Sequence, residues 1–259
     1  FWAWDPVENS SLVPWLVLFG AGHVMIVNKN KGGSLFTTHL LAIASFLLVL
    51  YSTFLTRSGI LGESSVHAFT DLGMQGQLVL YVLTFLLLCV VLLIDNSLLK
   101  ISYLMFSFLL MFFGLVYGYK TILFYTWVIT SIGLTVFSYS KYFPKEKDEE
   151  ELYSREFWMF LGAFVLLLSA LVITYFTSIP VMNKLFAMKK APLQKADYNL
   201  WTVPFAILLL ILIASAQFLK YKKTPAKEFY KKLALSFIVS VLFGSACSIP
   251  LYFIKDFSD

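Results

Sequence analysis

The sequence predicts an all-α, polytopic integral membrane protein. Hydrophobic residues make up 59% of the 259 residues and charged residues only 14%, whereas a soluble domain carries about a quarter charged residues. The mean hydropathy is +0.79, and the apolar residues are gathered in long runs. The net charge of +5 is therefore not interpreted as a nucleic-acid footprint, and no nucleic-acid partner is expected.

About eight apolar runs are long enough to cross the membrane as helices, since crossing about 30 Å of hydrocarbon takes roughly 17 to 25 residues. Helices are predicted because the short alternating strands of a membrane barrel are absent from the sequence. The predicted spans cover residues 12–28, 36–56, 77–95, 101–118, 121–140, 157–179, 200–219 and 233–254.

The positions of Lys and Arg predict which side each loop faces. If residue 1 lies outside, the inner loops hold most of the 20 cations, including the six lysines between Lys220 and Lys232. Cytoplasmic loops carry an excess of Lys and Arg. The N-terminal segment and the loop after the second span are therefore expected on the outer face.

The N-terminal segment places tryptophans beside polar groups directly before the first apolar run. Trp2, Trp4 and Trp15 offer flat aromatic surfaces that can hold a large planar ligand. Tryptophans at an interface are more often membrane anchors, and that interpretation stays open. The polar groups among them are Asp5, Glu8 and Asn9.

The same segment also predicts a helix start. Asp5 is suited to be an N-cap, Pro6 follows at the first helical position, and Glu8 stands three residues after the cap. We expect this variant of a capping box to start a short helix on the membrane surface.

Two of the three histidines are candidates to bind iron. His67 lies in the outer loop after the second span, where a neutral imidazole suits axial ligation, with a surface histidine as the equal alternative. His23 lies inside the first span, where an ionisable group is costly and by default functional. A hydrogen bond to a neighbouring helix is its alternative. His39 is expected to reach water near the inner interface.

The two candidate histidines are expected to serve separate iron positions. His23 follows Trp15 by a helical distance of roughly 12 Å, so it cannot easily share one iron with His67. The guanidinium of Arg57, in the same outer loop, could pair with a carboxylate of the ligand. Cys89 and Cys247 belong to no C-x-x-C motif, and packing is their expected role.

These motifs resemble those of the CcmF family of bacterial cytochrome c maturation proteins. Residues 1–16 resemble the WWD signature of heme-handling proteins in its CcmF version, and residues 53–59 and 65–69 resemble a second signature in the same order. Residues 154–156 and 203–205 extend the similarity, while the spans within 101–140 are additional to the family pattern. The chain is expected to be an internal part of such a protein.

The resemblance implies a cytochrome c heme lyase of the bacterial inner membrane with its active face in the periplasm. The family joins heme, delivered by the chaperone CcmE, to apocytochrome c presented with CcmH, through thioether bonds to a C-x-x-C-H motif. His67 would ligate the incoming heme, and His23 would ligate a resident heme b that reduces it with electrons from quinol. The remaining expected heme contacts are Trp2, Trp4, Asp5, Pro6, Glu8, Asn9, Trp15 and Arg57.

The expected organisation has three parts. Residues 1–95 hold the WWD segment, the heme-ligand helix and the outer histidine loop; residues 96–156 hold the extra helix pair and a cytoplasmic loop; residues 157–259 hold the last spans. The buried and surface sites are expected to lie a short distance apart. The alternatives are a transporter, which would show paired broken helices and inverted repeats, and a non-catalytic membrane scaffold.

Overall fold

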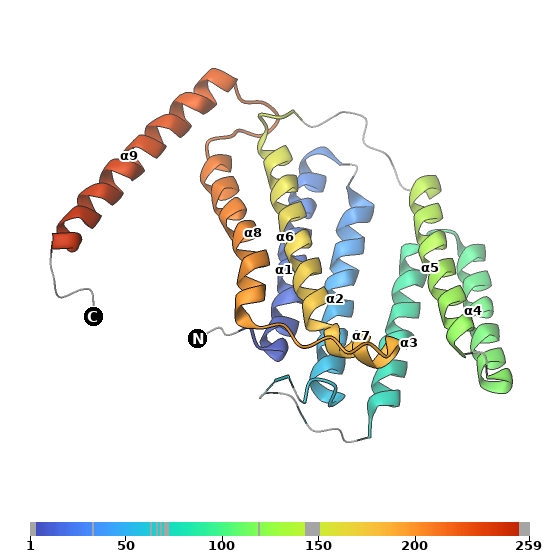
Figure 1. The fold of residues 1–259 in the computed structure, drawn as a ribbon. Coiled ribbons are helices and arrows are strands. Elements are labelled where there is room, and N and C mark those ends of the chain that lie inside the picture. Colours follow the sequence, from blue (N-terminus) through green and yellow to red (C-terminus); the bar gives the residue numbers. More distant parts are fainter. Residues whose placement is uncertain are drawn as a thin grey trace.

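The computed structural model describes residues 4–32, 34–62, 64–65, 67, 69, 73–118, 120–142 and 151–253. Within these ranges the regular structure is α-helical throughout (Figure 1). The helices are α1 (Pro6–Lys31), α2 (Leu35–Arg57), α3 (Gln75–Leu93), α4 (Ser97–Tyr117), α5 (Lys120–Tyr142), α6 (Arg155–Thr177), α7 (Ile179–Phe186), α8 (Lys195–Ala216) and α9 (Ala226–Phe253).

The predicted fold class is confirmed. Among the described residues, eight helices are long and apolar enough to cross a membrane, and α7 is the short helix that does not qualify. An α-helix pairs nearly all of its backbone groups within itself, as hydrocarbon requires. The eight long helices alternate in direction in Figure 1, with α7 lying crosswise between α6 and α8, so the start of α1, the end of α2 and the start of α8 lie at one end of the bundle.

Several helices begin earlier than the hydropathy predicted, and α1 and α8 show the reason. α1 starts at Pro6 and runs without a break through Pro14 to Lys31, so the expectation of a separate short surface helix at Asp5 is wrong. α8 starts at Lys195, where Gln194 and Asp197 form a capping box. Hydropathy misses such first turns because capped polar residues are stable there although they are not apolar.

α1 packs between α2 and α6, and this contact forms the main core. Val13, Val17 and Val24 of α1 are buried against Leu41 of α2 and Ile173 of α6. Small residues let the backbones approach closely, as is common between membrane helices. A Cβ added at Gly20 would lie 3.6 Å from the carbonyl oxygen of Ala163 in α6.

α4 and α5 form a hairpin beside α3. The hydroxyl groups of Tyr103 in α4 and Ser131 in α5 share a buried hydrogen bond of 2.7 Å. Ser138 near the end of α5 donates to the carbonyl oxygen of Leu93 in α3 (3.1 Å) and accepts from the backbone N–H of Asp95 (3.3 Å). The hairpin is therefore tied to α3 at the end of the bundle opposite the N-terminus.

The segments before α6 and after α8 interlock at that same opposite end. The buried carboxylate of Glu156 accepts a hydrogen bond of 2.9 Å from the backbone N–H of Lys222, whose φ is +69°. The N–H of Thr224 donates to the carbonyl oxygen of Tyr153 at 2.8 Å. These bonds satisfy backbone groups that the turn between α8 and α9 would otherwise leave unpaired.

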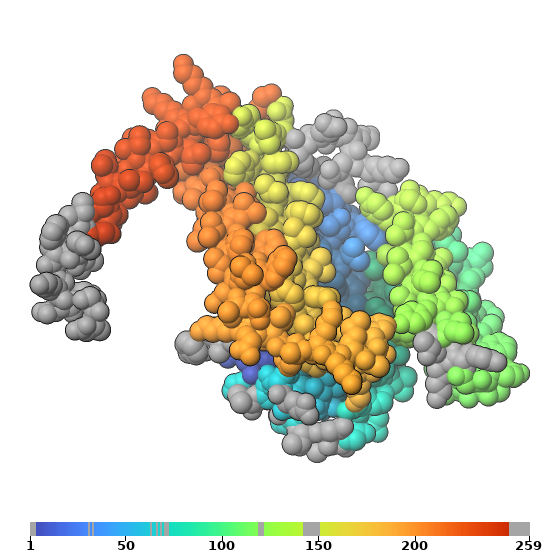
Figure 2. Space-filling view, viewed as in Figure 1, coloured from blue at the N-terminus to red at the C-terminus, as the bar shows by residue number. Residues whose placement is uncertain are grey.

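α9 leans away from the other helices, as Figures 1 and 2 show. Its first turn is held by Phe229, whose ring packs 5.9 Å from that of Trp158 in α6. Farther along, Leu235, Phe237 and Phe243 are 62%, 68% and 71% exposed. In the part of α9 that the structure describes, the apolar side chains therefore face the surrounding medium.

The close packing of α1 on α6 predicts a stability difference between two glycines of α1. Gly20→Leu should lower the free energy of unfolding by about 1 to 3 kcal/mol, because the larger side chain has to displace the Ala163 backbone. Gly22→Leu is the matched control, since no atom lies within 4 Å of a Cβ built there. Thermal melting of both variants in detergent measures the effect. Equal losses of stability in the two variants would show that the contact between α1 and α6 does not limit residue size at position 20.

Candidate functional site

Trp4 is fixed against α8 at the N-terminal end of the bundle. Its indole N–H donates to the side-chain oxygen of Asn199 at 2.7 Å. Its ring stacks on the buried ring of Tyr198, with centroids 5.3 Å apart and planes 8° from parallel. The φ angle of Trp4 is +60°, a left-handed conformation that a bulky residue adopts only under constraint. Trp4 is therefore held in one orientation by a helix distant in sequence.

Asn9 in α1 supports the orientation of Trp4 through its backbone. Its side chain is fully buried, and its amide nitrogen donates to the carbonyl oxygen of Trp4 at 3.0 Å. The neighbouring Ser10 hydroxyl donates to the carbonyl oxygen of Val7 and lies 2.9 Å from the hydroxyl of Ser52 in α2. Asn9 thus holds the unusual backbone of Trp4, and Ser10 joins the first turn of α1 to α2.

Asp5 joins the N-terminal segment to the loop between α2 and α3, which is the loop expected on the outer face. It is the N-cap of α1, and its Oδ1 accepts from the N–H of Val7 at 2.9 Å. The same oxygen accepts from the hydroxyl of Ser65 at 2.7 Å, across 60 positions of sequence. The oxygen of that hydroxyl accepts from the backbone N–H of His67 at 3.1 Å. The loop that carries His67 therefore lies against the start of α1.

His67 and Arg57 are both exposed at this end of the molecule. The guanidinium carbon of Arg57 lies 4.0 Å from the centroid of the Phe69 ring, a cation–π contact. The N–H of Phe69 donates to the carbonyl oxygen of Thr56 at 3.2 Å, which brings the loop back onto the end of α2. The loop is thus held to Asp5 through Ser65 and to the end of α2 through Phe69, and it carries both the exposed His67 and the ring that Arg57 contacts.

The remaining residues of the predicted site divide into two groups. Pro6 and Glu8 lie in the first turn of α1, where an acidic side chain interacts favourably with the helix dipole. Trp15 lies about 13 Å farther along α1 at 1.5 Å per residue, and its side chain is 55% exposed. Trp15 is therefore not part of the surface formed around Trp4. Trp2 lies outside the described residues.

Trp15 begins a column of rings on the outward face of α1. Its ring centroid lies 5.3 Å from that of Phe19, and the Phe19 centroid lies 5.0 Å from that of His23. The Nδ1 atom of His23 bonds the carbonyl oxygen of Phe19 at 2.9 Å, in its own helix. The neighbouring-helix bond considered as the alternative for His23 is therefore replaced by a bond within α1.

The distance between the two candidate histidines is larger than the sequence suggested. His23 lies about 26 Å along α1 from Pro6, whereas the Asp5–Ser65 bond keeps the His67 loop at the start of the same helix. The expectation of a short separation assumed that Trp15 lies at the outer surface. Because α1 already begins at Pro6, the two positions are about twice as far apart as expected.

The donor chemistry of His23 fits heme iron. An iron-binding histidine usually bonds one ring nitrogen to a carbonyl or carboxylate, which orients the ring and leaves the other nitrogen for the metal. His23 has this arrangement, with Nδ1 on Phe19. His39 has it too, with Nδ1 2.8 Å from the carbonyl oxygen of Leu35. The bond from the ring to a carbonyl oxygen four residues earlier is therefore compatible with iron binding at His23. Because His39 makes the same bond, it does not by itself single out His23.

Sequence reasoning missed the partners that fix this site. Tyr198 and Asn199 stand in the first turn of α8, in a polar stretch that hydropathy left outside the seventh span. Ser65 is one of several serines of the loop, and only the folded chain reveals its bond to Asp5. The signal for Tyr198 and Asn199 was an aromatic and an amide at the outer start of a span, but no pattern indicates which helix they face.

Comparisons with known proteins identify relatives of this chain. The family model described as Cytochrome C assembly protein matches residues 1–61. The chain is similar to the cytochrome c-type biogenesis protein CcmF of Haemophilus influenzae, with 30% identity over 99% of this chain and 32% of that protein. CcmF of Escherichia coli is 28% identical over 95% of this chain and 32% of that protein. The biogenesis protein ccl1 of Rhodobacter capsulatus is 45% identical over 33% of this chain and 13% of that protein.

The compared regions define what the similarity covers. In three CcmF relatives the match covers between 95% and 99% of this chain but only between 29% and 32% of the length of the relative. The family model covers the N-terminal segment, α1, α2 and the first residues of the outer loop. No solved structure matches the chain.

The Asp5–Ser65 bond predicts a local effect on the outer loop. Ser65→Ala should increase amide hydrogen exchange at residues 64–69, because a hydrogen bond to a carboxylate contributes about 1.5 to 3 kcal/mol. Ser64→Ala is the control, since the Ser64 hydroxyl bonds the nearby carbonyl oxygen of Leu61. Unchanged exchange in Ser65→Ala would mean that Asp5 does not hold the loop.

Proposed function

The chain belongs to the CcmF family of cytochrome c-type biogenesis proteins, and on that premise we propose that it handles heme and attaches it to apocytochrome c. The reaction class is that of a cytochrome c heme lyase, acting on the periplasmic face of the bacterial inner membrane. The observation that carries the proposal is the bond from Ser65 to Asp5, because it joins the His67 loop to the WWD segment.

In the outer site, the residues around Asp5 bind and orient the heme substrate. The exposed imidazole of His67 ligates the incoming iron, and the guanidinium of Arg57 pairs with a propionate carboxylate. Trp4 gives a rigid aromatic edge to the surface, since Tyr198 and Asn199 already fix its ring. The rigid support keeps the porphyrin in one orientation while the apocytochrome approaches.

The ligation requires positioning more than acid or base strength. Each thioether forms when the S–H of a cysteine in the C-x-x-C-H motif adds across a heme vinyl group, so sulfur and hydrogen both stay in the product. No external oxidant is consumed by that addition. His67 and Arg57 hold the heme from one side and leave its vinyl edge accessible to the two thiols.

The inner position is assigned to the resident cofactor. We assign His23 as a residue that would hold heme b, and this group would supply the electrons for reduction of the incoming heme iron, with quinol as the donor. The Phe19 carbonyl fixes the His23 ring and directs its other nitrogen away from the helix. The partners of the whole reaction are the heme chaperone CcmE, CcmH and apocytochrome c.

Histidine variants of the full-length protein test the proposal. His23→Ala should remove the heme absorbance that copurifies with the protein, because an axial ligand is lost. His67→Ala should keep that absorbance but lower the yield of mature cytochrome c by on the order of tenfold or more. Soret absorbance per protein and heme-stained cytochrome c are the two measurements.

His39→Ala is the matched control, since His39 makes the same bond to its own helix and is not assigned to heme. It should equal wild type in both measurements. If neither His23→Ala nor His67→Ala differs from wild type, the residue assignments are wrong. If the wild-type protein neither carries heme nor supports cytochrome c maturation, a transporter or a non-catalytic scaffold replaces the proposed lyase.

A further inference from the structure

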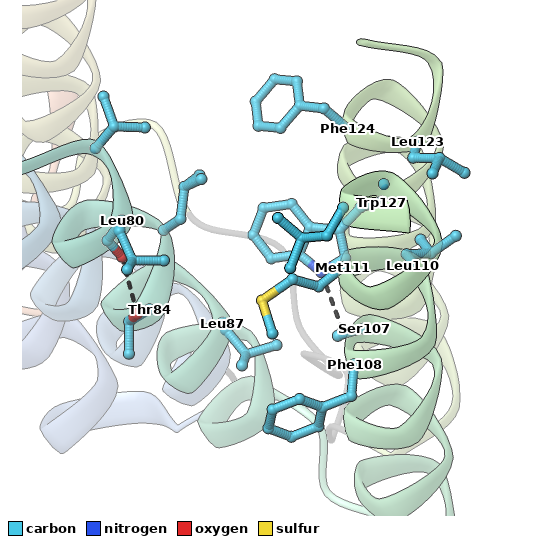
Figure 3. Close-up of a pocket in the computed structure, with 14 residues that line it drawn as sticks. Leu80, Thr84, Leu87, Ser107, Phe108, Leu110, Met111, Leu123, Phe124 and Trp127 are labelled. Carbon is cyan, nitrogen blue, oxygen red and sulfur yellow. Dashed lines mark hydrogen bonds between the residues drawn. The ribbon is translucent and has the colours of Figure 1, made fainter. Parts of the chain in front are cut away.

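A cavity of about 470 Å³ lies between α3 and the α4–α5 hairpin, away from the outer site. Figure 3 shows side chains from all three helices directed into this space, among them Leu87, Met111, Phe108 and Trp127. All three helices are candidate membrane spans. The volume falls within the range of about 300 to 1,000 Å³ that is usual for small-molecule sites.

The polar side chains of the lining already use their donors within the protein. The hydroxyl of Thr84 donates to the carbonyl oxygen of Leu80 at 2.8 Å. The indole N–H of Trp127 donates to the hydroxyl of Ser107 at 3.0 Å, and that hydroxyl donates to the carbonyl oxygen of Tyr103 at 2.8 Å. The cavity therefore presents hydrocarbon and aromatic surface, and a polar ligand would lose its hydration there without compensation.

The cavity exists because the hairpin is tied to α3 at one end. Near the end of α3, Ile94 and Val90 pack against Tyr103 in a buried cluster, and Ser138 bonds the carbonyl oxygen of Leu93. The lining residues, 79–87 of α3, 107–115 of α4 and 123–127 of α5, begin beside this cluster, where Leu87 and Trp127 pack on it, and continue away from it along the three helices. The helices thus separate toward the end of the bundle that carries the N-terminal segment.

We propose that this cavity binds one hydrocarbon chain of a phospholipid from the membrane leaflet on the side of the N-terminal segment. The surrounding medium of three membrane spans supplies such chains, and the lining is predominantly apolar, with its few polar groups bonded within the protein. None of its lining residues is charged, so the site recognises the chain and not the headgroup. An isoprenoid quinone is the competing occupant, but its ring would meet no available hydrogen-bond donor among the lining side chains.

Native mass spectrometry of the full-length protein in detergent tests this inference. With added phosphatidylethanolamine or phosphatidylglycerol, the wild type should retain about one phospholipid with similar strength for both headgroups. Leu87→Trp from α3 and Met111→Trp from α4 should each weaken retention roughly tenfold, or about 1.4 kcal/mol, by filling the cavity. Two variants from different helices guard against a folding defect in one.

Leu98→Trp and Leu92→Trp are the matched controls, since these leucines of α4 and α3 are 72% and 71% exposed and do not line the cavity. They should retain lipid as the wild type does. Equal retention in the filled and control variants, or no retained lipid in the wild type, would overturn the proposal. Retention of an added polyprenyl quinone that phospholipid does not displace would overturn it in favour of the quinone.

Discussion

The packing of α1 between α2 and α6 is the contact on which the rest of the structure depends. Without a hydrophobic driving force between helices in lipid, close van der Waals packing has to hold them together. Gly20 and Ala163 allow that approach, and the buried side chains of α1 fill the space on either side. Because α1 runs the length of the bundle, its position sets both the outer surface near Asp5 and the depth of His23.

Polar groups are concentrated at the two ends of the bundle, and each end is closed in its own way. At one end the carboxylate of Asp5 caps α1 and accepts from Ser65, so a single side chain fixes a helix start and a loop. At the other end the buried carboxylate of Glu156 accepts from the backbone of Lys222. In both places N–H or O–H donors offset part of the desolvation cost of the carboxylate by replacing lost water.

Much of the fold could be predicted from sequence because hydrocarbon imposes one rule on every span. The helices and their alternation follow from runs of apolar residues, and the proximity of the His67 loop to the N-terminal segment follows from that alternation. Helix starts were less predictable, since capping makes polar first turns stable in α1 and α8. The stacking of Trp4 on Tyr198 could not be foreseen, because the choice of neighbouring helix depends on shape and not on periodicity.

The attachment of α9 through Phe229 has a geometric consequence. At 1.5 Å per residue this helix is about 42 Å long, and the contact of Phe229 holds it near one end only. The arm from Phe229 to the end of α9 is about 36 Å long, so a tilt of roughly ten degrees about Phe229 would move the far end sideways by about 6 Å. A neighbouring protein or lipid that contacts α9 in a bilayer would set the angle of this helix. The force would be transmitted to the contact between Phe229 and Trp158.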